Sequence, residues 1–306
     1  MKRCLSIFAV VALLATVAVN AQNAASTSNT AVKDTSDPRL DPDSKARGVH
    51  WAKGVVRAAK PAKPGGANML WHNGAIMTDA AARAIFWGPS WGINPGDKIS
   101  GMDTWYSGYG GSHYAGTTTE YTGTNGRVGT TVTYGGHVVD TTSASGGQQT
   151  STILAEVCRN IANPAANGYY PVYTDLPRGS AGYCAWHSYG SCGSTPVQIA
   201  FFWKLDGDAG CDPGSGVSGE SQGLAAIANV SGHELAEAMT DPRNGGWYDS
   251  RGNENGDKCA WSFNVPSVTF TNGSQWKIQG EWSNKAYTAG TGYPNNSGQR
   301  GCLDGH

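Results

Sequence analysis

The spacing of hydrophobic residues predicts both strands and helices in this chain. An almost continuous apolar run at 197–205 is typical of a buried strand, and shorter runs at 84–87 and 169–173 predict two more. The stretch 128–139 predicts a further strand, or a hairpin broken by two adjacent glycines. Short strands and turns are expected over 265–293.

Two other segments carry apolar residues at helical spacing. The first is 151–162, and the second is 221–240, which is rich in alanine and is followed by Pro242. Strands and helices therefore alternate along the chain. This alternation predicts a single α/β or α+β domain with a mixed β-sheet.

The second helix contains the sequence H-E-x-x-E, formed by His233, Glu234 and Glu237. His233 and Glu237 lie one turn apart and face the same way, whereas Glu234 lies roughly 100° round the helix. In the H-E-x-x-H zinc peptidases, two histidines at this spacing hold the metal and the glutamate activates the metal-bound water. We therefore expect a central zincin-like helix with Zn²⁺ on His233 and Glu237 and with Glu234 as general base. The alternative is a surface helix with solvated polar side chains.

The loop after this helix offers further oxygen ligands. Asp241 lies one turn beyond Glu237 on the same side, and Glu254 or Asp257 could fold back over the helix, so any of these three could complete a metal site. Oxygen-rich spacing also suits Ca²⁺, which Asp249, Asn253, Glu254 and Asp257 would bind. A plain surface turn also accounts for these residues.

The remaining histidines have simpler explanations. His50, His72 and His113 are expected to be turn or core residues, whereas His187 or His137 could approach the metal site. A serine-hydrolase interpretation of 216–219 is weak, because the spacing is not that of a nucleophile elbow.

The first 21 residues have the pattern of an export signal. Lys2 and Arg3 precede an apolar run at 5–19, and small residues at 19–21 offer a cleavage site. The run is too short for a comfortable membrane span, and no later stretch approaches one. The mature protein is therefore expected to be secreted, either extracellular or periplasmic.

Removal of the signal takes Cys4 and leaves six of the seven cysteines. An even number in an exported chain without a C-x-x-C pair predicts disulfide bonds, although six cysteines allow 15 pairings. Cys184 and Cys192 could close a small loop, and a bridge from Cys259 would hold the acidic loop near the helix.

Composition divides the rest of the chain. The stretch 23–43 has hardly a large apolar side chain, and 60–66 is rich in Pro and Gly. This composition predicts that 22–66 is a disordered linker or a pro-segment, whereas 67–306 is long enough for one domain. The chain has 22 basic against 23 acidic side chains and no basic patch, which argues against a nucleic-acid partner. The abundant Trp and Tyr favour core packing over a groove for polymers.

Several short blocks resemble a known family. The residues 71–78, 85–88, 184–186 and 229–248 are similar, in the same order, to the phosphate-induced protein 1 family, known in plants as EXORDIUM proteins, in its bacterial branch. This resemblance implies an exported, wall-associated protein without a settled activity. Plant members do not keep His233, Glu234 and Glu237, so plant biology does not carry over, whereas bacterial relatives resemble this chain in pairing H-E-x-x-E with an acidic tail before a cysteine.

Two functions are compatible with these patterns. The first is a secreted zinc-dependent hydrolase, a metallopeptidase acting on a peptide. The second is a non-catalytic exported protein that binds cell-wall polysaccharide or peptide and uses the acidic cluster for a structural cation. The sequence gives no indication of the oligomeric state.

Overall fold

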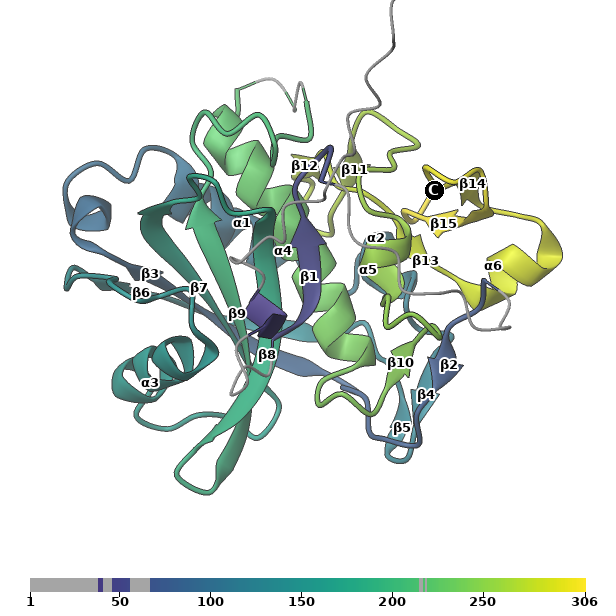
Figure 1. The fold of residues 1–306 in the computed structure, drawn as a ribbon, viewed down its shortest axis with the longest axis horizontal. Coiled ribbons are helices and arrows are strands. Elements are labelled where there is room, and N and C mark those ends of the chain that lie inside the picture. Colours follow the sequence, from purple (N-terminus) through teal and green to yellow (C-terminus); the bar gives the residue numbers. More distant parts are fainter. Residues whose placement is uncertain (1–37, 41–45, 56–66, 215–216, 218) are drawn as a thin grey trace, which may run out of the picture. The chain divides into compact units, whose positions relative to one another are not determined.

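A computed structural model describes residues 38–40, 46–55, 67–214, 217 and 219–306 (Figure 1). The predicted export signal, most of the predicted linker or pro-segment, and residues 216 and 218 of the weak serine-hydrolase motif lie outside the described residues. All described residues belong to one compact unit within Lys33–His306.

A six-stranded mixed sheet is the largest element of this unit, with the order β1-β8-β9-β7-β3-β6. Strands β6, β3, β7 and β9 are parallel neighbours, and β8 and then β1 add antiparallel strands at one side. The strands are β1 Arg47–Trp51, β3 Ala80–Trp87, β6 Val132–Asp140, β7 Gly168–Pro177, β8 Tyr183–Cys192 and β9 Thr195–Lys204. The mixed sheet predicted from the sequence is confirmed.

Helices cover both faces of this sheet. The six helices of the described chain are α1 Lys98–Tyr109, α2 His113–Gly116, α3 Thr150–Asn160, α4 Gln222–Thr240, α5 Asn255–Lys258 and α6 Asn284–Ala289. Successive residues of a strand point to opposite faces. On β8, a Cβ at Gly190 would meet Leu154 of α3, whereas His187 points to α4. Helices α3 and α4 therefore lie on opposite faces.

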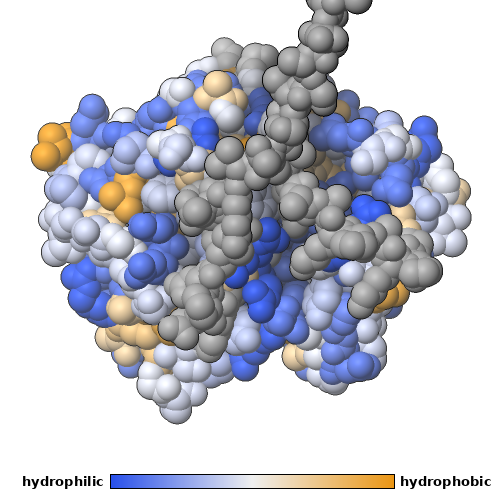
Figure 2. Space-filling model, viewed as in Figure 1, coloured by the Kyte–Doolittle hydropathy of each residue, from blue (hydrophilic) through white to orange (hydrophobic). Residues whose placement is uncertain are grey.

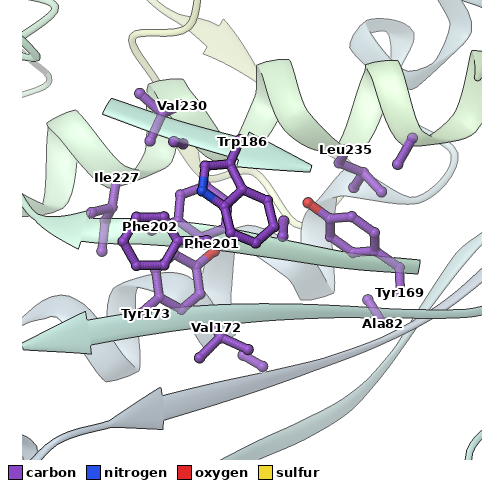
Figure 3. Packing of buried hydrophobic residues seen from close by; sticks show 14 of the residues in the cluster. Ala82, Tyr169, Val172, Tyr173, Trp186, Phe201, Phe202, Ile227, Val230 and Leu235 are labelled. Carbon is purple, nitrogen blue, oxygen red and sulfur yellow. The ribbon is translucent and has the colours of Figure 1, made fainter. Parts of the chain in front are cut away.

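Helix α4 packs its apolar residues on the sheet and forms the centre of the core. Figure 3 shows Ile227, Val230 and Leu235 of this helix against aromatic side chains of β7 and β9. Among these, Tyr173 and Phe202 stack with ring centroids 4.6 Å apart. Aromatic residues fill much of the interior, so the expectation of core packing for Trp and Tyr is confirmed. On the face in Figure 2, hydrophobic residues form scattered spots on a largely polar described surface.

Small elements complete the unit. The 3₁₀ helices are η1 Pro38–Leu40 and η2 Pro89–Gly92. The short strands pair as β2 Leu70–Trp71 with β10 Trp247–Tyr248, β4 Thr122–Gly123 with β5 Gly126–Arg127, and β11 Val268–Thr269 with β12 Gln275–Trp276, while β13 Glu281–Trp282 and β14 Tyr293–Pro294 flank β15 Arg300–Leu303. The short strands and turns predicted over 265–293 are confirmed, except that 284–289 forms the helix α6.

One expectation about the elements is wrong, and one of two alternatives is confirmed. The prediction of no structure over 22–66 is wrong for β1, which is buried at Gly48, Val49 and His50 and pairs with β8. The stretch 128–139 forms one strand, β6, and its two glycines cause only a register irregularity beside β3. Polar and glycine-rich β8 and α1 escaped prediction because their patterns lack a clear period.

Three disulfide bonds join Cys158 to Cys192, Cys184 to Cys211 and Cys259 to Cys302. The suggested Cys184–Cys192 pair is wrong, because the two residues lie at opposite ends of the extended strand β8. A bridge from Cys259 near the acidic loop is present. Three disulfides are consistent with a secreted protein. None of the described helices is long and apolar enough to cross a membrane.

Candidate metal centre

Helix α4 places three ionisable side chains in the interior. Ser221 caps the helix by accepting a hydrogen bond from the Leu224 backbone N–H. His233, Glu234 and Glu237 lie in the second half of the helix and are each 0% exposed. The prediction that H-E-x-x-E is helical is confirmed, and the alternative of a solvated surface helix is wrong. Polar groups at this depth require partners or a bound ion.

Glu237 lies between two histidines. Its Oε1 accepts a hydrogen bond from the Asp257 backbone N–H at 2.9 Å and lies 3.1 Å from Nε2 of His233. Its Oε2 lies 3.7 Å from Nε2 of His187. The two carboxylate oxygens therefore face two different imidazoles.

The first group of metal-ligating atoms combines His187, Glu237 and Glu254. His187 comes from β8, and its Nε2 lies 3.3 Å from Oε2 of Glu254, the residue that precedes α5. One donor atom from each of the three residues lies within 4.8 Å of the others, and all three residues are buried. Ligand atoms of a tetrahedral zinc site are about 3.3 Å apart, so this spacing suits zinc.

The second group combines His233, Glu237 and Asp257, again within 4.8 Å of one another. Asp257 belongs to α5, and its Oδ2 accepts a hydrogen bond from the Glu254 backbone N–H at 3.3 Å. The short helix α5 thus brings Glu254 to one group and Asp257 to the other. Glu237 belongs to both groups.

Gln279 fixes the orientation and the tautomer of His233. Its Oε1 accepts from the Trp261 backbone N–H at 3.1 Å, and its Nε2 donates to the Gly256 carbonyl at 2.9 Å. Turning the amide over would break both bonds. The other Nε2 hydrogen therefore points to Nδ1 of His233 at 3.0 Å. Because Nδ1 accepts, the proton of neutral His233 resides on Nε2, towards Glu237.

His50 of β1 joins the same network, although the sequence indicated only a turn or core residue. It is fully buried, and its ring stands edge-on to that of His233 with centroids 4.2 Å apart. Its Nε2 donates to Oε1 of Gln279 at 2.9 Å. The site therefore includes a strand from the segment predicted to be disordered.

Burial sets the protonation states of these groups. It lowers the pKa of His187 to about 3 and that of His233 to about 4. It also raises the pKa of Glu234 and of Glu254 well above the usual range, and neighbouring carboxylates, Glu237 and Asp241 respectively foremost, add to this effect. Without a cation, the cluster therefore favours neutral imidazoles on His187 and His233 and protonated carboxyl groups on Glu234 and Glu254. A bound cation would favour the ionised carboxylates.

Other predicted site residues are not members of these groups in the described chain. Oδ1 of Asp241 accepts hydrogen bonds from the backbone N–H groups of Gly245 and Gly246, which closes the turn after α4. Oδ1 of Asp249 accepts from the Asn253 backbone N–H in a local turn. Neither Asp241, Asp249 nor Asn253 belongs to the two donor groups in the described chain.

The histidines expected near the site behave differently. His187 reaches it from β8, as described above. His137 pairs instead with Asp103 at 2.9 Å, where both side chains are about one-third exposed.

The donor atoms fit a divalent transition metal. Each group supplies one imidazole nitrogen and two carboxylate oxygens, a set that zinc accepts. Nδ1 of His187 is buried without a hydrogen bond to the described residues. Three donors leave a coordination position for a further ligand.

Comparisons with protein-family models, with curated proteins and with solved structures found no significant match.

Proposed function

We propose that this protein is an exported zinc-dependent hydrolase that cuts polypeptides, with zinc held by His187, Glu237 and Glu254. The observation that carries the proposal is the convergence of these three donor atoms from β8, α4 and the start of α5. Elements this far apart in sequence bring a nitrogen and two carboxylates together in a buried place. Such an arrangement costs free energy unless a cation compensates it.

The group around His233 is the weaker choice. A zinc-bound imidazole usually donates its other ring N–H to an acceptor. His233 meets the opposite situation, because Gln279 directs an N–H at its Nδ1. The sequence pattern gave His233 and Glu237 as the ligands. No donor of the described chain is directed at Nδ1 of His187, so we choose His187 in place of His233.

Zinc at this position would polarise a substrate carbonyl and lower the pKa of a bound water. Glu234 is the residue that we assign as proton acceptor. Its carboxyl group is buried on α4 beside Glu237, and the resulting upward shift of its pKa is the change that a general base working near neutral pH requires. The H-E-x-x-E helix then resembles the zincin helix in function.

A second candidate function is a non-catalytic, exported wall-binding protein with a structural cation. The complete burial of Glu237 favours it, because a structural ion needs no access for substrate. Trp71 and Leu70 of β2, which are 40% and 48% exposed, would then offer an aromatic and apolar surface to a wall polymer.

We also propose that the resemblance to the phosphate-induced protein 1 family reflects a true relationship. Two of the similar blocks meet in the fold, because Trp71 at the start of the first block pairs with Trp247 near the end of the last. This contact supports the proposal by giving both blocks one structural role.

Metal analysis tests the proposed function. We expect about one zinc per chain in the purified protein and its loss in His187→Ala, with no change in His137→Ala, which alters a surface histidine. Glu234→Ala should keep the zinc and lose hydrolysis of an unfolded protein substrate. Absence of zinc, or calcium that His187→Ala leaves in place, would favour the structural-cation candidate.

A further inference from the structure

Strand β1 lies directly over the candidate metal centre. It pairs antiparallel with β8, with Arg47 opposite His187 and His50 opposite Ala185, and it also contacts α4 (Figure 1). Its central residues are buried. A strand at the side of the sheet thus closes the site that a polypeptide substrate would have to enter.

The closest approach is at Gly48. A Cβ added there would lie 1.9 Å from Oε2 of Glu237 and 2.3 Å from the ring of His187. Gly48 also has a φ of +44°, which favours glycine. Only a residue without a side chain can therefore bring its backbone so near these two metal-ligating groups.

The pairing of β1 with β8 is irregular. Register shifts occur between Arg47 and His50 and again between His50 and Trp51. Strand β1 also bonds to residues outside β8. His50 donates to Gln279, and the Trp51 carbonyl accepts from the indole N–H of Trp261. Two irregularities within one short strand contrast with the continuous pairing of β8 with β9 on its other side. Strand β1 is therefore paired with β8 through only part of a regular ladder of backbone hydrogen bonds.

We propose that β1 occupies the binding site for an extended polypeptide that adds antiparallel to β8, with glycine at the position of Gly48. Addition of a strand to a sheet edge is a common way to bind peptides, since backbone bonds supply affinity and local space selects side chains. The hydrolytic outcome rests on the proposed function, whereas the binding site does not. Under this proposal, the 22–66 segment is a pro-segment rather than a linker.

Opening of the site requires the chain to be cut between β1 and β2. Water hydrolyses one peptide bond, so the new carboxyl group receives the hydroxyl oxygen and the new amino group receives the proton. β1 can then leave β8 without unwinding the rest of the chain. The vacated edge would present the β8 backbone beside Glu237 and His187.

The test uses the full chain with a specific-protease recognition sequence inserted between residues 60 and 61. The probe is a fluorescently labelled synthetic peptide with the sequence of residues 44–55. Its binding is measured by fluorescence anisotropy, first with the uncut protein and then with the protein after cutting and dialysis. Matched peptides carry Gly48→Ala or Gly54→Ala. Both glycines have a positive φ, but a Cβ at Gly54 would meet no atom within 4 Å.

We expect the cut protein to bind the wild-type and Gly54→Ala peptides alike and the Gly48→Ala peptide at least roughly tenfold more weakly, because the added methyl group meets Glu237. The uncut protein should bind none of them. Equal binding of both alanine peptides, equal binding by the uncut protein, retention of the fragment after dialysis, or unfolding when it leaves would each overturn the proposal.

Peptide hydrolysis separates this inference from the proposed function. Binding as expected without cleavage in the presence of zinc would reject the hydrolase and leave the polypeptide site standing. Equal cleavage by the uncut and the cut protein would support the hydrolase function and reject the proposal that β1 occupies the polypeptide-binding site.

Discussion

Gln279 donates a hydrogen bond from Nε2 to Nδ1 of His233 across 3.0 Å. The same side chain accepts hydrogen bonds from His50 and from the Trp261 backbone N–H. One amide therefore connects β1, α4 and the segment after α5. It also decides which nitrogen of His233 carries the proton, which no pattern in the H-E-x-x-E sequence reveals.

Replacement of this amide should be costly for stability. Gln279→Leu leaves buried groups of His50, His233 and Trp261 without their partner, so we expect a loss of roughly 3 kcal/mol in the free energy of unfolding. Urea denaturation measures this loss. Gln148→Leu, on an exposed residue, serves as control and should change the midpoint little. Equal midpoints for the two variants would contradict the role of Gln279.

The two histidines beside Glu237 should differ in their effect on zinc binding. We expect His187→Ala to abolish binding, because it removes a ligand, and His233→Ala to keep about one zinc per chain with reduced affinity, because its ring only packs beside the site. Competition with a chromophoric chelator measures both affinities. Zinc lost in His233→Ala but retained in His187→Ala would assign the metal to the other group.

The sequence predicted the elements with strong periodicity. Residues 221–240 form α4 almost as expected, and 197–205 falls largely within β9, because their apolar patterns match a helix and a buried strand. The sequence did not indicate β1 or β8. Arg47–Trp51 is too short and too polar to predict a strand, and it is stabilised by tertiary contacts.

The candidate site was only partly predictable for the same reason. The spacing of His233 and Glu237 is local and follows from the helix period. His187, His50 and Gln279 are brought to the site by sheet pairing and by loop contacts, and these long-range relations leave no local pattern. The one available signal for His187 was the rarity of histidine in the chain, seven in all.

The Cys259–Cys302 disulfide should support zinc binding through α5. Cys259 directly follows this helix, which holds Asp257 against Glu237 and is capped by Glu254. Replacing both cysteines by serine should lower stability by about 3 kcal/mol and should also weaken zinc binding. Chelator competition and thermal unfolding measure the two effects.

The matched control is the Cys158–Cys192 disulfide. The two bridges span 34 and 43 residues, so removing either one increases the entropy of the unfolded chain by a similar amount. Cys158 belongs to α3, on the opposite face of the sheet from α4. Its removal should lower stability without changing zinc affinity. A similar loss of affinity in both double variants would show that α5 has no special role.

Glu220 should make the folded state less stable as the pH rises. Burial raises its pKa to about 7, and the charge of Asp97 adds to the shift. Between the unfolded pKa of 4.5 and about 7, the folded state holds more of this proton than the unfolded state, so stability falls over that range and the loss is complete above it. Glu220→Gln removes this dependence. Because the residue is partly exposed, screening limits the gain at pH 8 to roughly 1 kcal/mol, or about 3 °C in melting temperature. At pH 4 the two proteins should melt together, and a difference that stayed constant from pH 4 to pH 8 would contradict the assignment.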